Sequence, residues 1–245
     1  MKTIQRTRIK ICGLTRETDI DAAVAAGADA VGFVLYNKSP RQVSIQRAAE
    51  LASRLPPFVT PVLLFVNEDA STIQAACIAV AGASIQFHGD ETPQQCLLAS
   101  QQGARPFLRA ARIPLGEAGG RFDLVKYALD YSRAQAILLD AAVDGYGGGG
   151  QAFNWSLLPP NVNAHLVLSG GLNAANVGDA ILQLRPRAKS LAVDVSSGVE
   201  LSGVGNKGIK DPEKIVQFVA AVRAADRQFE ILAARGANAA LHKQP

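Results

Sequence analysis

The chain has 245 residues, of which 48% are hydrophobic and 19% are charged, and its formal net charge is +4. This composition supplies a substantial apolar core and excludes a disordered chain. The Lys and Arg residues are scattered along the sequence, which argues against nucleic acid as a partner and is compatible with attraction of an anionic small molecule.

The cysteines and the hydropathy pattern indicate a reduced, cytoplasmic protein. Cys12, Cys77 and Cys96 have no paired spacing, so we expect neither a disulfide framework nor a zinc site. No apolar stretch reaches the roughly 20 residues that a membrane span needs, and no signal-peptide core follows residues 1–7. We therefore expect a cytoplasmic location and no membrane partner.

Short apolar segments follow one another along the chain, separated by stretches with helix signals. Successive segments begin about 22 to 30 residues apart, which is the length of one strand and one helix. Ser44 is an expected N-cap for a helix over Ile45–Leu55, and Asp211 precedes Pro212 at the start of another helix. The apolar segments begin near Arg8, Ala30, Val59, Ala83, Arg105, Gln135, Ala164 and Ser190.

The segment Val59–Val66 is almost entirely apolar, which indicates a strand buried on both faces, as in parallel sheets covered by helices. An open doubly wound sheet would give the same pattern. Eight units without a change in composition favour closure into an eightfold β/α barrel, the TIM-barrel architecture. We predict one α/β domain over residues 1–225. The Ala-rich tail over residues 226–245 is expected to extend the last helix, form another helix, or be partly disordered.

The carboxyl ends of the expected strands carry polar residues that would meet at one rim of the barrel. In a β/α barrel this rim holds the active site. A barrel with a purely structural role has little reason to end several apolar strands in this way. The titratable residues at these ends are Cys12, His88, Arg109, Asp140 and Asp194.

Cys12 and Asp140 end the first and the sixth expected strand, on opposite sides of the rim. A thiolate can act as a base and a carboxylic acid as a proton donor, so this pair could move a proton within a small substrate. The structural alternatives are a buried core cysteine and an aspartate that caps a turn.

The ends of the seventh and eighth expected strands predict a phosphate site. Gly170, Gly171 and Gly198 would let backbone N–H groups approach an anion, and Ser196 and Ser197 add hydroxyl donors. Ordinary glycine turns are the alternative.

Four further residues have both a functional and a structural interpretation. Arg41 could grip a carboxylate or be a solvated loop charge. His88 could be a site residue or a hydrogen-bonded strand-end histidine. Arg109 could face a ligand or form a buried ion pair, and Asp194 could orient a substrate hydroxyl or hold the phosphate loop in shape. The glycine-rich segment 145–150, after the sixth strand, favours a mobile active-site loop over a plain linker.

A series of motifs runs in order from residue 9 to about residue 220. The motifs are Lys10-Ile11-Cys12-Gly13-Leu14-Thr15, Gly32-Phe33-Val34, Lys38-Ser39-Pro40-Arg41, Phe65-Val66-Asn67, Gln86-Phe87-His88-Gly89-Asp90-Glu91, Leu139-Asp140, Phe153-Asn154-Trp155, Leu168-Ser169-Gly170-Gly171-Leu172-Asn173, Asp194-Val195-Ser196-Ser197-Gly198-Val199-Glu200 and Gly208-Ile209-Lys210-Asp211. The set resembles the phosphoribosylanthranilate isomerase family, and the cysteine motif and the motif at 194–200 are the most specific parts.

The resemblance implies an isomerase of tryptophan biosynthesis that acts on a small phosphorylated substrate. The reaction would convert N-(5-phosphoribosyl)anthranilate to 1-(2-carboxyphenylamino)-1-deoxyribulose 5-phosphate by an Amadori rearrangement. Asp140 would be the general acid at the furanose ring oxygen, Cys12 the base at C2, and Arg41 the ligand of the anthranilate carboxylate. No metal or organic cofactor is implied, and we expect a monomer or a homodimer.

The resemblance also implies that the phosphate lies in the loops after the last two strands. The remaining substrate-binding candidates are therefore His88, Arg109, Asp194, Gly170, Gly171, Ser196, Ser197 and Gly198.

Three positions depart from the family pattern. Gly149 stands where Ser or Thr is usual, Asn37 stands where proline is common, and the segment Leu201–Lys207 looks several residues longer than usual. The last departure puts the geometry of the loop beside the phosphate in doubt. The alternative is the related isomerase barrel of histidine biosynthesis, a family that is similar in fold and reaction but uses two aspartates. Cys12 at the end of the first strand argues against membership of that family. A non-catalytic barrel is disfavoured because Cys12, Asp140 and the phosphate loops are all present.

Overall fold

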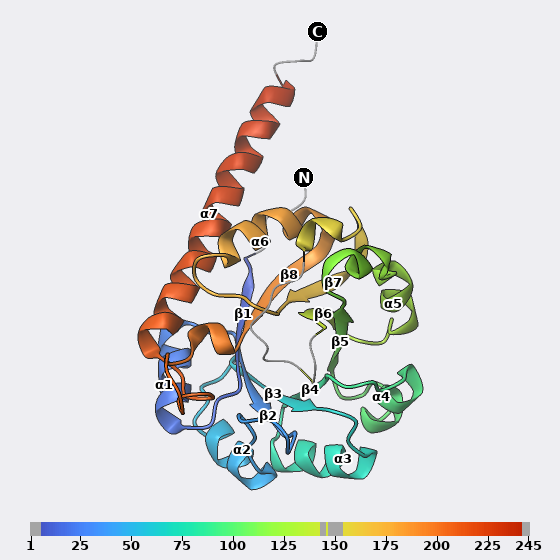
Figure 1. Cartoon of the computed structure of the whole chain (residues 1–245), viewed down its shortest axis with the longest axis vertical. Helices are drawn as coiled ribbons and strands as arrows, with labels where there is room; N and C mark the ends of the chain where they lie inside the picture. Colours follow the sequence, from blue (N-terminus) through green and yellow to red (C-terminus); the bar gives the residue numbers. More distant parts are fainter. Residues whose placement is uncertain (1–5, 143–145, 147–153, 242–245) are drawn as a thin grey trace.

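The repeated apolar segments form eight parallel strands that close on themselves, because β1 pairs with both β2 and β8. The computed structural model describes residues 6–142, 146 and 154–241. The closed barrel confirms the predicted architecture and excludes the open sheet (Figure 1). The strands are β1 (Arg8–Cys12), β2 (Ala30–Val34), β3 (Thr60–Phe65), β4 (Ser84–Phe87), β5 (Phe107–Ile113), β6 (Ala136–Ala141), β7 (Val162–Leu168) and β8 (Ala188–Val195).

Helices surround the barrel on its outside (Figure 1). Ser44 Oγ accepts a hydrogen bond from Arg47 N at the start of α2, as predicted, and Thr92 and Gln95 form a capping box at the start of α4. None of the helices in the described part of the chain is long and apolar enough to span a membrane. The helices are α1 (Glu17–Ala26), α2 (Ile45–Ala52), α3 (Ala70–Ala79), α4 (Pro93–Ala99), α5 (Leu124–Asp130), α6 (Val177–Leu184) and α7 (Pro212–Leu241), with short 3₁₀ segments η1 (Gly116–Arg121), η2 (Trp155–Leu157), η3 (Arg185–Arg187) and η4 (Ser197–Val199).

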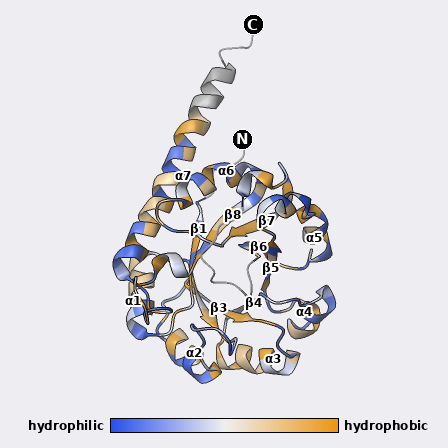
Figure 2. Cartoon of the chain, viewed as in Figure 1, coloured by the Kyte–Doolittle hydropathy of each residue, from blue (hydrophilic) through white to orange (hydrophobic). Residues whose placement is uncertain are grey.

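Side chains along each strand alternate between the helix-covered outside and the interior of the barrel. Outward residues such as Phe33, Phe65 and Phe87 join apolar helix residues in the main core. Figure 2 shows the hydrophobic residues concentrated in the strands, with many hydrophilic residues on the helices. Several inward positions are polar instead, among them Lys10 and Gln86, which are both buried. These inward polar residues define the region in which a functional site is expected.

The last helix, α7, runs through the tail as far as Leu241 and projects beyond the barrel (Figure 1). Its first part packs on the barrel through residues such as Phe218, which is fully buried. Asp226 anchors this part, because its carboxylate accepts hydrogen bonds from the backbone N–H of Thr7 at 3.1 Å and from its hydroxyl at 2.6 Å. Beyond this anchor Leu232 is about half exposed, so the tail continues the helix away from the barrel.

Candidate active site

The carboxyl end of β6 places Asp140 beside His88, which follows β4. His88 Nε2 lies 2.9 Å from Asp140 Oδ2, and Gln86 Nε2 lies 3.0 Å from His88 Nδ1. The other carboxylate oxygen of Asp140 accepts a hydrogen bond from the backbone N–H of Ala141 at 2.9 Å. In this arrangement Gln86 donates to Nδ1, so a neutral His88 ring carries its proton on Nε2 and donates it to Asp140.

The orientation of the Gln86 amide decides which arrangement of protons this chain holds. Gln86 Oε1 is buried and has no hydrogen-bond partner among the described residues. Turning the amide by half a turn would place Oε1 against His88 Nδ1 and move the ring proton to that nitrogen. In that arrangement His88 Nε2 becomes a hydrogen-bond acceptor that faces the Asp140 carboxyl group.

Cys12 ends β1 and is buried on the inner face of the barrel. Lys10 lies two residues earlier on the same face, and its Nζ donates to Asp194 Oδ1 at 2.8 Å. Gly32 on the neighbouring strand has no side chain, and a Cβ there would lie 2.6 Å from Cys12 Sγ, so only glycine leaves room for the thiol. The thiol is thus held beside a buried ion pair.

Burial raises the pKa of the Cys12 thiol, against the lowering influence of the Lys10 and Lys210 ammonium groups. Asp194 also raises the pKa of Cys12, because a nearby negative charge disfavours the thiolate. Burial opposes the charged form of Lys10 as well, but the Asp194 carboxylate raises the pKa of Lys10 to about 12. In the structure without substrate, burial therefore outweighs the lysines and favours the neutral thiol.

The loops after β7 and β8 pack against each other. Gly170 and Gly171 have φ values of 76° and 63°, which favour glycine. A Cβ on Gly198 would lie 1.9 Å from the backbone oxygen of Leu172, so this contact also requires glycine. Ser196 Oγ donates to the backbone oxygen of Cys12 at 3.0 Å, so its hydroxyl proton is engaged within the protein. The structure brings the predicted phosphate residues together and adjacent to β1.

Arg41 is buried and makes a two-pronged ion pair, so the alternative of a solvated loop charge is wrong. Its Nε donates to Glu200 Oε1 at 2.6 Å and its Nη2 to Glu200 Oε2 at 3.0 Å. Lys210 Nζ shares Oε1 of the same carboxylate at 3.0 Å. Burial would raise the pKa of Glu200, but the hydrogen bonds and charges of Arg41 and Lys210 hold it below its usual value.

Most of the chain matches a known protein family. A family described as N-(5'phosphoribosyl)anthranilate (PRA) isomerase matches residues 9–221. A relative named N-(5'-phosphoribosyl)anthranilate isomerase from Methylibium petroleiphilum is 59% identical over 90% of this chain and 96% of its own length. The crystal structure of phosphoribosyl anthranilate isomerase from Thermotoga maritima is 37% identical, covers 89% of this chain and 99% of that chain, and superposes with a TM-score of 0.76. The chain belongs to this isomerase family.

A further structure of the family bears on the ligand. A phosphoribosyl anthranilate isomerase in complex with reduced 1-(o-carboxyphenylamino)-1-deoxyribulose 5-phosphate is 35% identical, covers 89% of this chain and 99% of that chain, and has a TM-score of 0.72. The family resemblance expected from the sequence motifs is thereby confirmed, and with it the isomerase class.

Arg109 is the sequence candidate that the structure does not bring to this isomerase site. The strand β5 runs on to Ile113, so Arg109 lies within the strand and on its outer face. Its Nη1 donates to Glu91 Oε2 at 3.2 Å, and its guanidinium lies 4.9 Å from the centre of the Tyr131 ring. The substrate-binding prediction for Arg109 is replaced by the buried ion pair, and the residue paired with Asp140 across β5 and β6 is Arg112.

Asp194 has both carboxylate oxygens engaged within the barrel. Its Oδ1 accepts from Lys10 at 2.8 Å and its Oδ2 from Ser169 Oγ at 3.3 Å. Ser169 directly precedes the Gly170-Gly171 turn. The contacts match the second interpretation of Asp194, in which it holds the loop after β7 in shape.

Gln86, Glu200 and Lys210 belong to the site but were not among the sequence candidates. Gln86 and Lys210 stood inside recognised motifs of the isomerase family, and Glu200 ended another. Motif membership was the one signal that could have selected them. Gln86 is two residues from its partner His88, whereas Glu200 and Arg41 are far apart in the sequence. Glu200 is separated from Arg41 by 159 residues.

Two of the departures from the isomerase pattern can be located, and the third cannot. The longer segment Leu201–Lys207 is closed at its base by a backbone bridge between Glu200 and Lys210, and Val204 at its tip is fully exposed. The extra residues therefore project outward and leave the base of the phosphate loop intact. Asn37 is an exposed turn residue after β2. Gly149 and most of the glycine-rich loop lie outside the described residues.

Tyr146 is the residue of the glycine-rich loop that the structure does describe. Its hydroxyl bonds to Asp90 and accepts from Asn67 Nδ2 at 3.1 Å, and the Arg112 guanidinium lies 4.7 Å from its ring centre. Its ring meets Tyr36 edge-on with the centroids 5.9 Å apart. Tyr146 thus links the ends of several strands across the mouth of the barrel.

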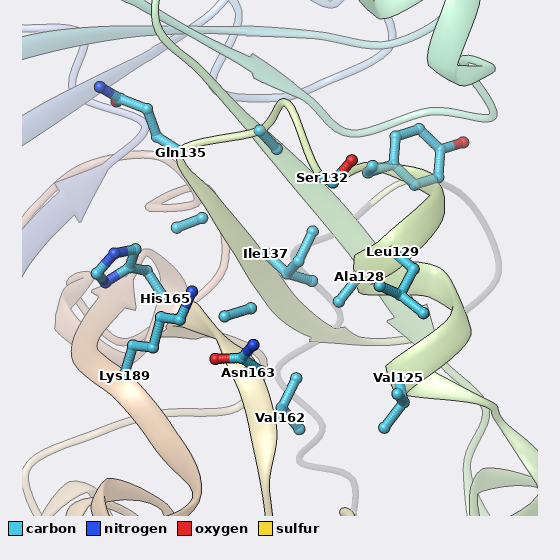
Figure 3. Close-up of a pocket in the computed structure, with 14 residues that line it drawn as sticks. Val125, Ala128, Leu129, Ser132, Gln135, Ile137, Val162, Asn163, His165 and Lys189 are labelled. Atoms are coloured by element: carbon cyan, nitrogen blue, oxygen red, sulfur yellow. The ribbon is translucent and has the colours of Figure 1, made fainter.

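A cavity of about 350 Å³ lies at the opposite end of the barrel (Figure 3). It is lined by α5 and by the first residues of β6, β7 and β8, such as Leu129, Ile137, Asn163 and Lys189. None of the acid, thiol or phosphate-loop residues borders it. In β/α barrels this end serves stability rather than catalysis, so the cavity is separate from the isomerase site.

Proposed function

We propose that the chain converts N-(5-phosphoribosyl)anthranilate to 1-(2-carboxyphenylamino)-1-deoxyribulose 5-phosphate, with Asp140 as the general acid and Cys12 as the base. The observation that carries this proposal is the placement of the two groups. They end β6 and β1 on the inner face of a closed barrel, beside the loops after β7 and β8. A substrate held at its phosphate by these loops would lie between an acid and a base.

The acid acts first in this mechanism. Asp140 donates a proton to the furanose ring oxygen, the bond from that oxygen to C1 breaks, and the nitrogen lone pair forms a Schiff base. His88 Nε2 lies against the Asp140 carboxyl group, so its proposed role is to orient the acid. The cation that forms on the substrate nitrogen makes the C2 proton more acidic.

The base acts second. Cys12 as thiolate removes the C2 proton, and the electron pair of that C–H bond neutralises the Schiff base to give an enolamine. The enolamine then tautomerises to the ketone. Because burial raises the pKa of Cys12 in the free enzyme, the positive Schiff base is the feature that favours the thiolate when it is needed. Every step is a proton transfer or the opening of the ring C1–O bond, and the substrate gains or loses no electrons, so the proposal names no metal or organic cofactor.

The two anionic ends of the substrate have separate partners in the proposal. Arg41 binds the anthranilate carboxylate, because a guanidinium can donate to a carboxylate in a fixed plane. The backbone at Gly170, Gly171 and Gly198 and the hydroxyl of Ser197 bind the phosphate.

We also propose a cellular location and an assembly state. A cytoplasmic location fits an enzyme of amino-acid biosynthesis with three free, buried cysteines. A Thermotoga maritima relative is described as a dimeric phosphoribosylanthranilate isomerase from which monomers were generated. We propose a monomer or a homodimer, and light scattering of the purified protein at several concentrations distinguishes the two.

The direct test follows the loss of anthranilate fluorescence when the purified protein meets freshly generated N-(5-phosphoribosyl)anthranilate. We expect turnover, and product identity can be checked by mass spectrometry after reduction. The phosphoribosyl substrate of the related histidine-biosynthesis isomerase, which undergoes the same type of rearrangement, serves as the comparison substrate. Folded protein that turns over only the comparison substrate, or neither one, contradicts the proposal.

A further inference from the structure

A buried network joins the proposed carboxylate residue to the loop proposed for the phosphate. Arg41 is held by Glu200 through Nε and Nη2, at 2.6 and 3.0 Å. Lys210 Nζ donates to Glu200 Oε1 and to the backbone oxygen of Ser196, both at 3.0 Å. Ser196 Oγ donates in turn to the backbone oxygen of Cys12 at 3.0 Å. Residues that follow β1, β2 and β8 are therefore tied into one hydrogen-bonded unit.

Glu200 controls the orientation of the Arg41 guanidinium. It accepts from two of the three guanidinium nitrogens, and no described residue accepts a hydrogen bond from the third, Nη1. A planar group bonded along one edge cannot rotate freely, so Nη1 is presented in a fixed place. A ligand carboxylate that binds there avoids the entropy loss of ordering a long side chain.

The backbone around Arg41 is packed closely enough to hold its stem as well. A Cβ on Gly13 would lie 2.6 Å from Arg41 Cδ, and a Cβ on Gly208 would lie 3.1 Å from the backbone oxygen of Pro40. Both glycines also have φ values in the left-handed region, at 76° and 92°. The stem and the charged end of Arg41 are thus both restrained before any substrate binds.

We propose that Glu200 is the positioning residue for carboxylate recognition, and that Lys210 couples it to the phosphate loop. The inference rests on the proposed role of Arg41. The unit contains two cations and one carboxylate, so the substrate meets a net positive charge. Because Arg41 and the Ser196 loop belong to the same unit, the distance between the two anionic ends of a bound substrate is fixed.

The charge of Glu200 makes the positioning role distinguishable from a simple electrostatic one. Replacing Glu200 by Gln removes a negative charge and should strengthen carboxylate binding if only charge matters. If positioning matters, the same change weakens carboxylate binding, because an amide presents N–H donors to two cations and cannot accept from both Arg41 nitrogens. The two explanations therefore predict opposite signs.

The experiment measures inhibition constants for two stable ligands of the full-length enzyme. One is reduced 1-(2-carboxyphenylamino)-1-deoxyribulose 5-phosphate, and the other is the same compound without the carboxylate. We expect the wild type to prefer the first by at least about tenfold, as for a charge-assisted hydrogen bond. Arg41→Met and Glu200→Gln should bring this ratio close to one. Glu200→Asp keeps the charge but shortens the side chain, so it should lower the ratio while preserving the fold.

Glu91→Gln is the matched control, because Glu91 and Arg109 form a buried pair of similar exposure on the outer side of β5. The Arg109–Glu91 side chains are 5% and 4% exposed, against 6% and 7% for Arg41–Glu200. We expect Glu91→Gln to lower the melting temperature and leave the ligand ratio at its wild-type value. A ratio that falls equally in this control overturns the positioning role.

The remaining outcomes separate the two proposals. A wild-type ratio in Arg41→Met would remove Arg41 from carboxylate binding and would contradict the proposed function of that residue. Loss of the ratio in Arg41→Met, together with an unchanged or increased ratio in both Glu200→Gln and Glu200→Asp, would contradict the role of Glu200 alone. If Glu200→Gln fails to fold, Glu200→Asp decides the matter by itself.

Discussion

The two sides of the barrel mouth hold their reactive groups in different ways. On the acid side, Asp140 is bonded by the His88 imidazole and by a backbone N–H group. On the base side, Cys12 is influenced by two ammonium groups, those of Lys10 and Lys210. A general acid has to give up a proton, and fixed hydrogen-bond geometry orients its carboxyl group for that transfer. A base has to lose one, which nearby cations favour.

The lysines on the base side are themselves paired, and this limits what they can do. Asp194 neutralises Lys10, and Glu200 is shared by Lys210 and Arg41. Burial consequently raises the pKa of Cys12 in the free enzyme. The comparison teaches that hydrogen bonds orient the acid group, whereas paired charges surround the base group without offsetting its burial.

The largest expected effect is the loss of the acid. Asp140→Asn keeps the shape of the side chain and its contact with the Ala141 N–H group, but an amide cannot protonate the ring oxygen. We expect kcat to fall about 10³-fold, the range of a general acid. The fluorescence assay gives the rate, and near-ultraviolet circular dichroism checks the fold. A loss below about tenfold would show that another group supplies the proton.

Replacement of the base should have the next largest effect. In Cys12→Ser the hydroxyl is a far weaker acid than the thiol, so its conjugate base is scarce, and we expect kcat to fall about 10²-fold. KM should change little, because the thiol is proposed to contact only the C2 proton. Cys77→Ser, a buried cysteine on α3, is the control for packing. Equal losses in both variants would assign the effect to packing and not to proton removal.

Alkaline pH should destabilise the fold through the base side. The pKa of Cys12 is raised from 9.0 by burial, and that of Lys10 is raised from 10.5 to about 12 by Asp194 despite burial. Both groups hold their protons more tightly when folded, so the stability they provide is complete below the unfolded pKa and is lost as the pH rises through the folded pKa. Lys10 alone contributes about 2 kcal/mol that is lost between about pH 10.5 and 12.

Urea unfolding at several pH values between 8 and about 12 measures this loss. The lowered pKa of Lys210, which burial causes, acts in the opposite sense and makes the decline shallower. An unfolding free energy that stays constant or rises over this range would contradict the described burial of Lys10 and Cys12.

A smaller effect is expected from Gln86, which contacts His88 and through it Asp140. Gln86→Leu leaves His88 Nδ1 buried without its partner, so the ring loses its orientation and its preferred tautomer. We expect kcat to fall about tenfold with little change in KM. Nitrogen NMR of the His88 ring should show a changed tautomer. Gln217→Leu, an exposed position on α7, is the control, and equal kcat values in the two variants would contradict the role of Gln86.

The architecture could be predicted from the sequence because its signals are local. Apolar segments of strand length, N-caps such as Ser44, and the spacing of one strand and one helix each depend on nearby residues. The same logic placed Cys12 and Asp140 at the correct rim, since carboxyl ends of parallel strands meet there. Closure of the barrel then followed from the number of units.

The misplacement of Arg109 has a different origin. Arg109 was expected at the carboxyl end of the fifth strand, yet the strand continues to Ile113. Successive side chains of a strand point to opposite faces of the sheet. The side chains that point into the barrel are therefore those of Leu108, Ala110 and Arg112, and the Arg109 side chain points to the helices. The Arg41–Glu200 pair could not be predicted either, because 159 residues separate its members and no periodic pattern connects them.

The network around Arg41 has a consequence for how the chain folds. The Ser196–Cys12 hydrogen bond closes a loop of 184 residues, so it joins the first strand to the segment after the last one. Contacts between residues so far apart in the sequence form late, because closing a long loop costs conformational entropy before the contact can form. Catalytic activity should therefore return after secondary structure during refolding.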